Sequence, residues 1–355
     1  MTNLSDQSQA RILRYVEMAI RYNASDIHLV SNHPPYFRIQ GKLRPMELPA
    51  MESAALKDLI YEMMTNRQRT VYEESQEIDF SYFCLKEFFF RVNVHTEKGC
   101  IAATIRIMPG LARSLEDLGL PPAVASLTQR LSGLILIVGR AGNGKTTTMT
   151  HMVDLINQQH QAKIITIEDP VEFVYESKKS LVIQREVGTD TASFASGLKH
   201  ALRQDPDVVV VGEMRDLESI SMALTTAETG HLVFATLHAP DALEAINRII
   251  DVYPGEKQNQ IRVQLAENLL AVIGQQLLPR RDSTERILAS ELMVPNLPIR
   301  NLIRRNALSE IRSQMETGSE NMYTLEQSLS SLVQRGLIYP ETAQSYAKFP
   351  KLLQF

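Results

Sequence analysis

One short stretch of the sequence places glycines, a lysine and a threonine at a spacing that can hold a polyphosphate. Residues 139–146 match G-x-x-x-x-G-K-[ST], the pattern of a phosphate-binding loop. Its glycines let the backbone curl around phosphates, so that the backbone N–H groups point at them. Lys145 would reach the β- and γ-phosphates, and the Thr146 hydroxyl would bind Mg²⁺. The residues expected to contact the nucleotide are Gly139, Arg140, Ala141, Gly142, Asn143, Gly144, Lys145, Thr146 and Thr147.

The flanking residues supply the elements that would position this loop. Residues 134–138 form a short apolar run, typical of a buried strand, and residues 147–156 have the pattern of a helix. A strand followed by a glycine loop and a helix directs backbone N–H groups and the positive end of the helix dipole at one point. This context favours a functional triphosphate site over a chance match.

Two acidic clusters follow strand-like runs further along the chain. Glu213 follows the apolar residues 208–211, and we interpret it as a general base, because hydrolysis needs a carboxylate beside the γ-phosphate. Glu168 and Glu172 follow residues 164–167, where they could hold magnesium through water, since ligands of open α/β sheets lie at the carboxyl ends of strands. Glu213 could instead cap a helix, and the residues around Glu168 could form a solvated turn.

A histidine and two arginines are further candidates for catalysis. His238 follows the apolar residues 232–236 and could sense the γ-phosphate or hydrogen-bond a catalytic carboxylate, although a lone histidine is often structural. Arg91 and Arg106 lie in adjacent predicted strands and could stabilise the charge that develops during phosphoryl transfer. An arginine in an amphipathic strand more often faces solvent, so the residues alone favour no catalytic role for these two.

The order of predicted elements indicates an α/β protein with several parts. An N-terminal α+β region comes first, and a strand–helix alternation that indicates a mostly parallel sheet covered by helices follows it. The segment 109–123 is rich in proline and glycine and is predicted to be a linker or hinge. Predicted strands are 26–30, 36–40, 88–95, 101–107, 134–138, 163–167, 208–211, 232–236 and 287–293, with one helix over 51–73. The predicted parts are residues 1–110, a linker at 111–130, an ATPase core at 131–295 and a helical region at 296–355.

Composition excludes several classes of protein. A net charge of −4 and the absence of tryptophan argue against a nucleic-acid partner. No apolar run approaches the roughly 18 residues of a membrane span, and no secretory signal is recognisable, so we expect a cytoplasmic protein whose membrane role is peripheral. The two cysteines, Cys84 and Cys100, are too few for a zinc tetrad and are interpreted as reduced.

Four motifs in this order resemble the secretion and type IV pilus ATPase superfamily, and within it the PilT-like retraction ATPases. Residues 24–29 also match an N-terminal signature of the family. The resemblance covers the chain from about residue 8. The motifs are Walker A at 139–146, the Asp box at 167–172, Walker B at 205–216 and the His box at 227–238.

The resemblance implies a PAS-like N-terminal domain and a RecA-like ATPase domain, assembled as a homohexamer that binds ATP and Mg²⁺. Arg91 and Arg106 match positions where the family's phosphate-facing arginines lie, which reverses the interpretation from residues alone. The implied activity is hydrolysis that drives rotation of an inner-membrane platform protein and removes pilin subunits from the pilus base. The implied location is the cytoplasmic face of the inner membrane.

Retraction is favoured over pilus extension for three reasons. The chain has no room for the additional N-terminal domain or the four-cysteine zinc element usual in extension ATPases, and residues 298–304 and 324–336 resemble the C-terminal region of retraction motors. The chain departs from the family pattern in two places. The first is at residues 141–143, where the change keeps the groups that contact phosphate, and the second is at Pro298. The second departure leaves open a PilU-like accessory motor or a specialised pilus system, and a pilus assembly ATPase is a further alternative. A nucleic-acid translocase and a non-hydrolysing regulator of the pilus machine are also consistent with a phosphate-binding loop.

Overall fold

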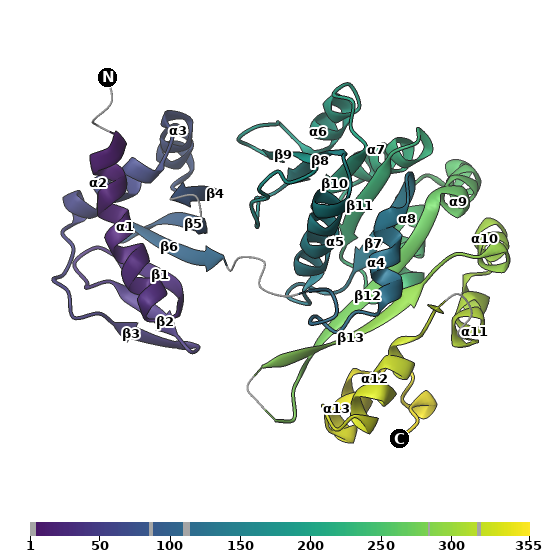
Figure 1. Ribbon diagram of the computed structural model, residues 1–355. Helices are drawn as coiled ribbons and strands as arrows, with labels where there is room; N and C mark the ends of the chain where they lie inside the picture. The colour runs from purple at the N-terminus through teal and green to yellow at the C-terminus, as the bar shows by residue number, and fades with distance from the viewer. Residues whose placement is uncertain (1–4, 85–87, 109–113, 283–284, 318–320) are drawn as a thin grey trace. The chain divides into compact units, whose positions relative to one another are not determined.

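The computed structural model describes residues 5–84, 88–108, 114–282, 285–317 and 321–355 (Figure 1). The chain divides into two compact units. Unit 1 comprises residues 1–112 and 170–174, and unit 2 comprises residues 113–169 and 175–355. We describe each unit by itself.

Unit 1 is built on a six-stranded antiparallel sheet with the strand order β3-β2-β1-β6-β5-β4. Alternate residues of its strands, such as Ile27, Val92 and Ile105, are buried with apolar residues of the helices α1 and α2 in one core. Asp26, Arg91 and Arg106 alternate with these residues and so lie on the opposite face of the sheet. The helices are α1 (Ser5–Arg21), α2 (Ser53–Met63) and α3 (Asn66–Ser75). The strands are β1 (Ala24–Val30), β2 (Tyr36–Ile39), β3 (Lys42–Pro45), β4 (Glu77–Cys84), β5 (Phe88–Glu97) and β6 (Cys100–Met108).

The structure confirms the four strands predicted in this unit. Strands β5 and β6 are joined at Lys98 and Gly99, both of which have positive φ. The single helix predicted over 51–73 is wrong, because the chain breaks into α2 and α3. Met64 is extended, and Thr65 starts α3 with a capping box in which its side chain accepts from the Gln68 backbone N–H. The cap satisfies N–H groups that a new helix leaves unpaired, and this favours a restart over one continuous helix.

Unit 2 is built on a seven-stranded sheet with the strand order β13-β12-β7-β11-β10-β8-β9. Its neighbouring strands are parallel except for the antiparallel pair β12–β13. Every residue of β7, β10 and β11 is buried, which matches their apolar sequences. The strands are β7 (Gly133–Val138), β8 (Lys163–Glu168), β9 (Leu181–Glu186), β10 (Val208–Val211), β11 (Leu232–Leu237), β12 (Leu269–Pro279) and β13 (Arg286–Met293).

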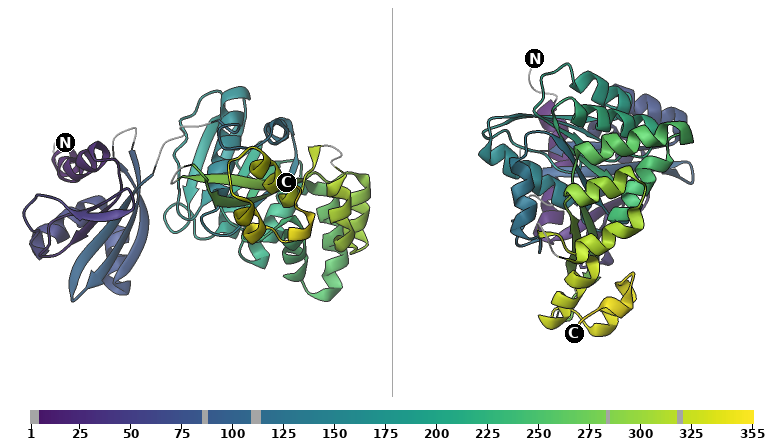
Figure 2. Two further views of the ribbon diagram at one scale, coloured as in Figure 1. Left: turned by 90° about the horizontal axis from the view of Figure 1, so that it is seen from below. Right: turned by 90° about the vertical axis from the view of Figure 1, so that its right-hand side faces the viewer.

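Helices cover this sheet and continue to the C-terminus. Helices α12 and α13, yellow in Figures 1 and 2, pack beside β12 and β13 in a small apolar cluster of their own. The α-helices are α4 (Pro122–Ser126), α5 (Lys145–Gln159), α6 (Phe194–Ala201), α7 (Leu217–Glu228), α8 (Ala242–Asp251), α9 (Gly255–Asn268), α10 (Leu297–Arg304), α11 (Ile311–Glu316), α12 (Leu325–Gln334) and α13 (Pro340–Tyr346). Short 3₁₀ turns occur at η1 (Leu127–Gln129), η2 (Leu308–Glu310) and η4 (Pro350–Leu352).

The five strands predicted for this region are confirmed, and so is the helical character of the C-terminal residues that the structure describes. The sequence patterns missed β9 and β12. Within the segment predicted as a linker, α4 begins at Pro122, and residues 109–113 lie outside the described part of the chain, so the linker stays a prediction.

Candidate nucleotide-binding and catalytic site

The loop at 139–146 has the strand–loop–helix setting that its sequence predicts. It leaves β7 at Val138 and ends where α5 begins at Lys145. Gly139, Gly142 and Gly144 all have positive φ, a conformation that favours glycine. A Cβ atom at Gly139 would lie 2.6 Å from the carbonyl oxygen of Gln275 on β12. The loop therefore needs glycine for its backbone conformation and, at its first position, for the close approach of a neighbouring strand.

Lys145 connects the loop to the end of β11. The residue is 8% exposed, and its side chain donates hydrogen bonds to the carbonyl oxygens of Gly139, at 3.0 Å, and Arg140, at 3.2 Å. Its Nζ also lies 3.4 Å from Nδ1 of His238. The lysine is thus held over the loop, close to the histidine that follows β11.

Glu213 and His238 meet because β10 and β11 are adjacent parallel strands, whose carboxyl ends lie at the same edge of the sheet. The Glu213 Oε1 atom is 3.2 Å from Nε2 of His238, and its Oε2 is 2.7 Å from Nη2 of Arg215. The two strand ends are joined further, since the Met214 backbone N–H donates to the Thr236 carbonyl and the Thr236 hydroxyl donates to the Gly212 carbonyl.

The charges around Glu213 decide its protonation state. Partial burial alone would raise the pKa of this carboxyl, but the hydrogen bond from Arg215 and the charges of Arg215, His238 and Lys145 bring the pKa below its ordinary value. Glu213 is therefore a carboxylate at neutral pH. A carboxylate with a lowered pKa is a weak proton acceptor, so this setting suits orienting a water molecule better than removing its proton.

Glu168 is the last residue of β8, the strand on the other side of β10. It is buried and accepts hydrogen bonds from the Thr166 hydroxyl, at 2.6 Å, and from the Gln184 side-chain amide, at 3.2 Å. A Cβ atom at Gly212 would lie 3.2 Å from the Glu168 Cα, so the two strand ends are in close contact. The structure thus brings Glu168, Glu213 and His238 to neighbouring strand ends.

Arg215 is the residue of this site that the sequence patterns missed. Besides its bond to Glu213, its Nη1 lies 3.9 Å from Asp169, the residue after Glu168. It thereby links the acidic segments that follow β8 and β10. The sequence could have indicated Arg215, because it lies two residues after Glu213 within the stretch that resembles Walker B.

A magnesium ion fits the donors at this edge of the sheet. Mg²⁺ keeps several waters and binds through one or two protein oxygens together with substrate phosphates, so it requires no cluster of protein ligands. The Thr146 hydroxyl at the start of α5 and the Glu168 carboxylate are oxygen donors of the required kind. No group of three or more His, Cys, Asp or Glu able to hold a metal occurs among the described residues. Glu172 belongs to unit 1, and its part in binding stays a prediction.

Arg91 and Arg106 also belong to unit 1, so their approach to the nucleotide stays a prediction. Within that unit they lie directly opposite each other on β5 and β6. Both are on the polar face of the sheet, since Val92 and Ile105 beside them are buried in the core. Arg106 donates from Nε to the Asp26 Oδ1 atom at 2.8 Å.

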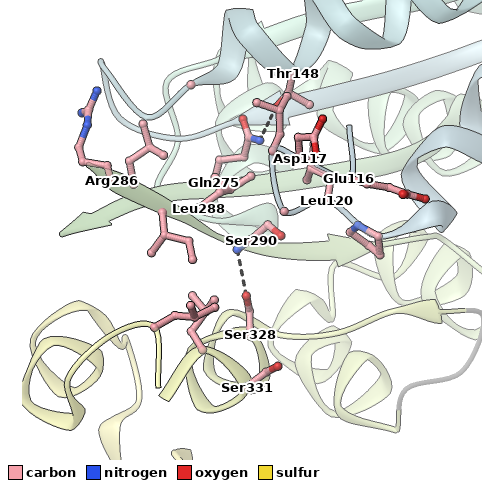
Figure 3. Close-up of a pocket in the computed structure, with 18 of the residues that line it drawn as sticks. Glu116, Asp117, Leu120, Thr148, Gln275, Arg286, Leu288, Ser290, Ser328 and Ser331 are labelled. Carbon is pink, nitrogen blue, oxygen red and sulfur yellow. Dashed lines mark hydrogen bonds between the residues drawn. The ribbon is translucent and has the colours of Figure 1, made fainter. Parts of the chain in front are cut away.

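A cavity of about 820 Å³ opens beside the loop within unit 2 (Figure 3). Gly144, Thr147 and Thr148 line it on the side of α5, and Gln275 on β12 donates from Nε2 to the Thr148 hydroxyl at 2.6 Å. Residues of the 116–121 segment, β13 and α12 complete the wall. Because the cavity adjoins the residues that follow Lys145, it has the position and size for the nucleoside part of a nucleotide.

Comparisons with known proteins agree with this geometry. Residues 5–346 match the family model described as type II/IV secretion system protein. The chain is similar to a twitching motility protein of Neisseria gonorrhoeae, at 42% identity over 90% of this chain and 86% of that protein. It is also similar to the type IV pilus retraction ATPase PilT of Pseudomonas aeruginosa, at 42% identity over 96% of this chain and 99% of that protein. A crystal structure of the pilus retraction motor PilT with bound ADP superposes with a TM-score of 0.91, at 45% identity over 96% of this chain and 98% of that one. No helix in the described part of the chain has the length and hydrophobicity that crossing a bilayer requires.

Proposed function

The chain belongs to the type II/IV secretion system protein family, in which it is an ATPase of the pilus-retraction type, and from this premise we propose how its residues carry out the reaction. The observation that carries the proposal is the contact series from Lys145 to His238 to Glu213 at the carboxyl edge of the unit 2 sheet. The names of the two relatives and of the solved structure favour retraction over an accessory motor, an assembly motor or a nucleic-acid translocase.

We propose that ATP binds with its phosphates in the loop from Gly139 to Thr147 and its nucleoside in the adjoining cavity. Backbone N–H groups of the loop and the start of α5 hold the phosphates. Lys145 binds the β- and γ-phosphates, while Thr146 and Glu168 hold Mg²⁺ directly or through water, with Glu172 as a further candidate. Magnesium supplies charge neutralisation of the phosphate oxygens when it is bound.

Hydrolysis requires a positioned water and cations that stabilise the developing charge. In this proposal Glu213 orients the water, and Arg215 keeps Glu213 ionised and correctly turned. His238 contacts both Lys145 and Glu213 and therefore reports whether a γ-phosphate is present. Arg91 and Arg106 supply the arginine contacts to the phosphates, which the family resemblance assigns to them.

The proposed assembly is a homohexamer on the cytoplasmic face of the inner membrane, where it acts on the pilus platform protein without nucleic acid. In this proposal unit 1 supplies the arginines and unit 2 supplies the phosphate loop. We propose residues 1–110 as the PAS-like domain, 111–130 as the linker, 131–295 as the RecA-like core and 296–355 as the helical C-terminal region.

The substitution Glu213→Gln tests the proposal. It removes the charge and keeps the shape, so ATP binding should persist while turnover falls to background, and Glu218→Gln on the exposed start of α7 is the matched control. In cells that lack the gene, excess surface pili should be corrected by the wild type and by Glu218→Gln but not by Glu213→Gln. Loss of pili in the deletion strain would instead identify an assembly motor, and an unchanged count an accessory role.

A further inference from the structure

A row of polar residues crosses five strands of the unit 1 sheet. Each residue lies directly opposite the next in the strand register, and directly opposite residues share a face. The row stands on the face that is not packed against the helices, since the residues beside it along the strands are buried in the core. From β2 to β4 its members are Arg38, Asp26, Arg106, Arg91 and Ser81.

The row contains three arginines and one acid, an unbalanced arrangement. Arg106 and Arg91 are opposite each other, and like charges in that position destabilise a sheet. Asp26 offsets part of this repulsion from the other side of Arg106. The row keeps a net positive charge, which suits an anion such as a phosphate chain.

The contacts of Asp26 hold Arg106 in a particular way. The Asp26 Oδ1 atom accepts from Arg106 Nε at 2.8 Å, while Oδ2 accepts from the Ser25 hydroxyl at 2.7 Å and lies 3.8 Å from Arg38 Nε. The Asp26 side chain is 5% exposed, whereas that of Arg106 is 61% exposed. The carboxylate is therefore buried at the base of the arginine, and the bond through Nε does not use the two terminal amines of the guanidinium.

Asp26 is charged under ordinary conditions, so the contact is an ion pair. Burial alone would raise the pKa of this carboxyl, but the hydrogen bonds from Ser25 and Arg106 and the charge of Arg106 bring the pKa below its usual value. Substitution by asparagine would remove the charge while leaving the size of the side chain nearly unchanged.

We propose that Asp26 is a positioning residue for ATP hydrolysis, which holds Arg106 by Nε so that its terminal amines, together with Arg91, meet the phosphates. This inference rests on the proposed phosphate contact of Arg106. An arginine side chain loses considerable rotamer freedom when it is ordered, and a buried carboxylate that orders it in the folded protein removes that cost from the reaction. The effect of Asp26 should thus appear in kcat rather than in ATP affinity.

A double-mutant cycle on the assembled full-length ATPase tests this inference. We expect Arg106→Gln to lower kcat about 100-fold and Asp26→Asn about 10-fold, with the KM for ATP within about twofold of wild type in the Asp26 variant. The double variant should be no slower than Arg106→Gln alone, since Asp26 acts through Arg106. Arg38→Gln is the matched control, because it removes the other arginine neighbour of Asp26, and its kcat should stay within about twofold of wild type.

For each variant, the melting temperature is measured as a control for folding, and sedimentation measures the size of the ring as a control for assembly. If Asp26→Asn fails to fold or assemble, Ser25→Ala replaces it, because Ser25 is exposed and its loss frees one oxygen of the carboxylate. That variant should lower kcat about threefold in wild type and not at all beside Arg106→Gln. Wild-type kcat in Asp26→Asn, or an effect that adds to that of Arg106→Gln, would overturn the inference.

The cycle also separates this inference from the proposed function. Turnover that survives Glu213→Gln would contradict the proposed hydrolytic site itself. If Glu213→Gln abolishes turnover but Arg106→Gln has normal turnover, the proposed contact of Arg106 with the phosphates is contradicted. The proposed role of Asp26 is then contradicted as well. Slow turnover in Arg106→Gln with normal turnover in Asp26→Asn would overturn the role of Asp26 alone.

Discussion

Glu291 on β13 is a buried acid whose ionisation should control the stability of unit 2. Its Oε1 atom accepts a hydrogen bond of 2.6 Å from the backbone N–H of Ala242, the first residue of α8. Burial raises the pKa of Glu291 to about 7, and the charges of Asp241 and Glu326 add to the rise, while the bond from Ala242 and the charge of Arg312 oppose it. The folded protein thus holds the Glu291 proton more tightly than the unfolded chain does.

The sign and size of the effect follow from this difference. A group whose pKa is raised on folding gives its full stabilisation below its unfolded pKa, near 4.5, and loses it as the pH rises through about 7. The loss over the whole window is about 3 kcal/mol, and about 2 kcal/mol of it falls between roughly pH 5.5 and pH 8, at 1.36 kcal/mol per pKa unit. Glu291→Gln retains an acceptor for the Ala242 N–H and cannot ionise.

Chemical denaturation of the wild type and Glu291→Gln at these two pH values measures the effect. The free energy of unfolding of the variant, minus that of the wild type, should rise by about 2 kcal/mol from pH 5.5 to pH 8. Glu47→Gln, at an exposed glutamate, is the control and should show no such rise. A difference between variant and wild type that does not change with pH would refute the reasoning, because it would mean that Glu291 ionises equally in both states.

Two further predictions concern the phosphate loop and its histidine neighbour. Gly139→Ala should destabilise the protein by about 3 kcal/mol, because its Cβ would meet a backbone oxygen and its φ is positive. Gly142→Ala, where the Cβ meets nothing within 4 Å, should cost only about 1 kcal/mol, and denaturation compares the two. His238→Ala removes the contact with Glu213 and one of the charges that lower the pKa of Glu213, so kcat should fall about 10-fold with little change in the KM for ATP. Steady-state kinetics at several pH values provide that test, and an unchanged kcat would place His238 outside the reaction.

Much of the candidate site could be predicted because its signals are local. The apolar runs that form β7, β10 and β11 are continuous, and the candidate site residues follow them in the chain. Adjacent parallel strands bring their carboxyl ends together, so the meeting of Glu213 and His238 follows once the strands are recognised. The lowered pKa of Glu213 does not follow from the pattern, because it depends on how Arg215 turns back onto the carboxylate.

The features that could not be predicted depend on how strands that are distant in the sequence pair in the sheets. β12 contains Gly274, Gln275 and Gln276 in its middle, which hides its strand pattern, although it pairs with β7 beneath the phosphate loop. Arg106 and Asp26 are 80 residues apart in the chain, and only the register of β1 and β6 brings them together. A solvated face was the natural interpretation of Arg106 by itself. Its buried carboxylate partner changes that interpretation.

The segment from His238 to Ala242 shows how the fold sets the position of His238, a candidate catalytic group. Glu213 contacts the His238 side chain at one end, and Glu291 accepts from the Ala242 backbone at the other. Arg248 on α8 also donates to the His238 carbonyl oxygen at 2.7 Å. Because this five-residue segment is held at both ends, its backbone has little freedom, and the imidazole is kept between Lys145 and Glu213. Glu213, whose pKa is lowered by its cationic neighbours, and Glu291, whose pKa is raised to about 7 by burial, therefore serve one geometry by different means, the first through charge and the second through its hydrogen bond to the backbone.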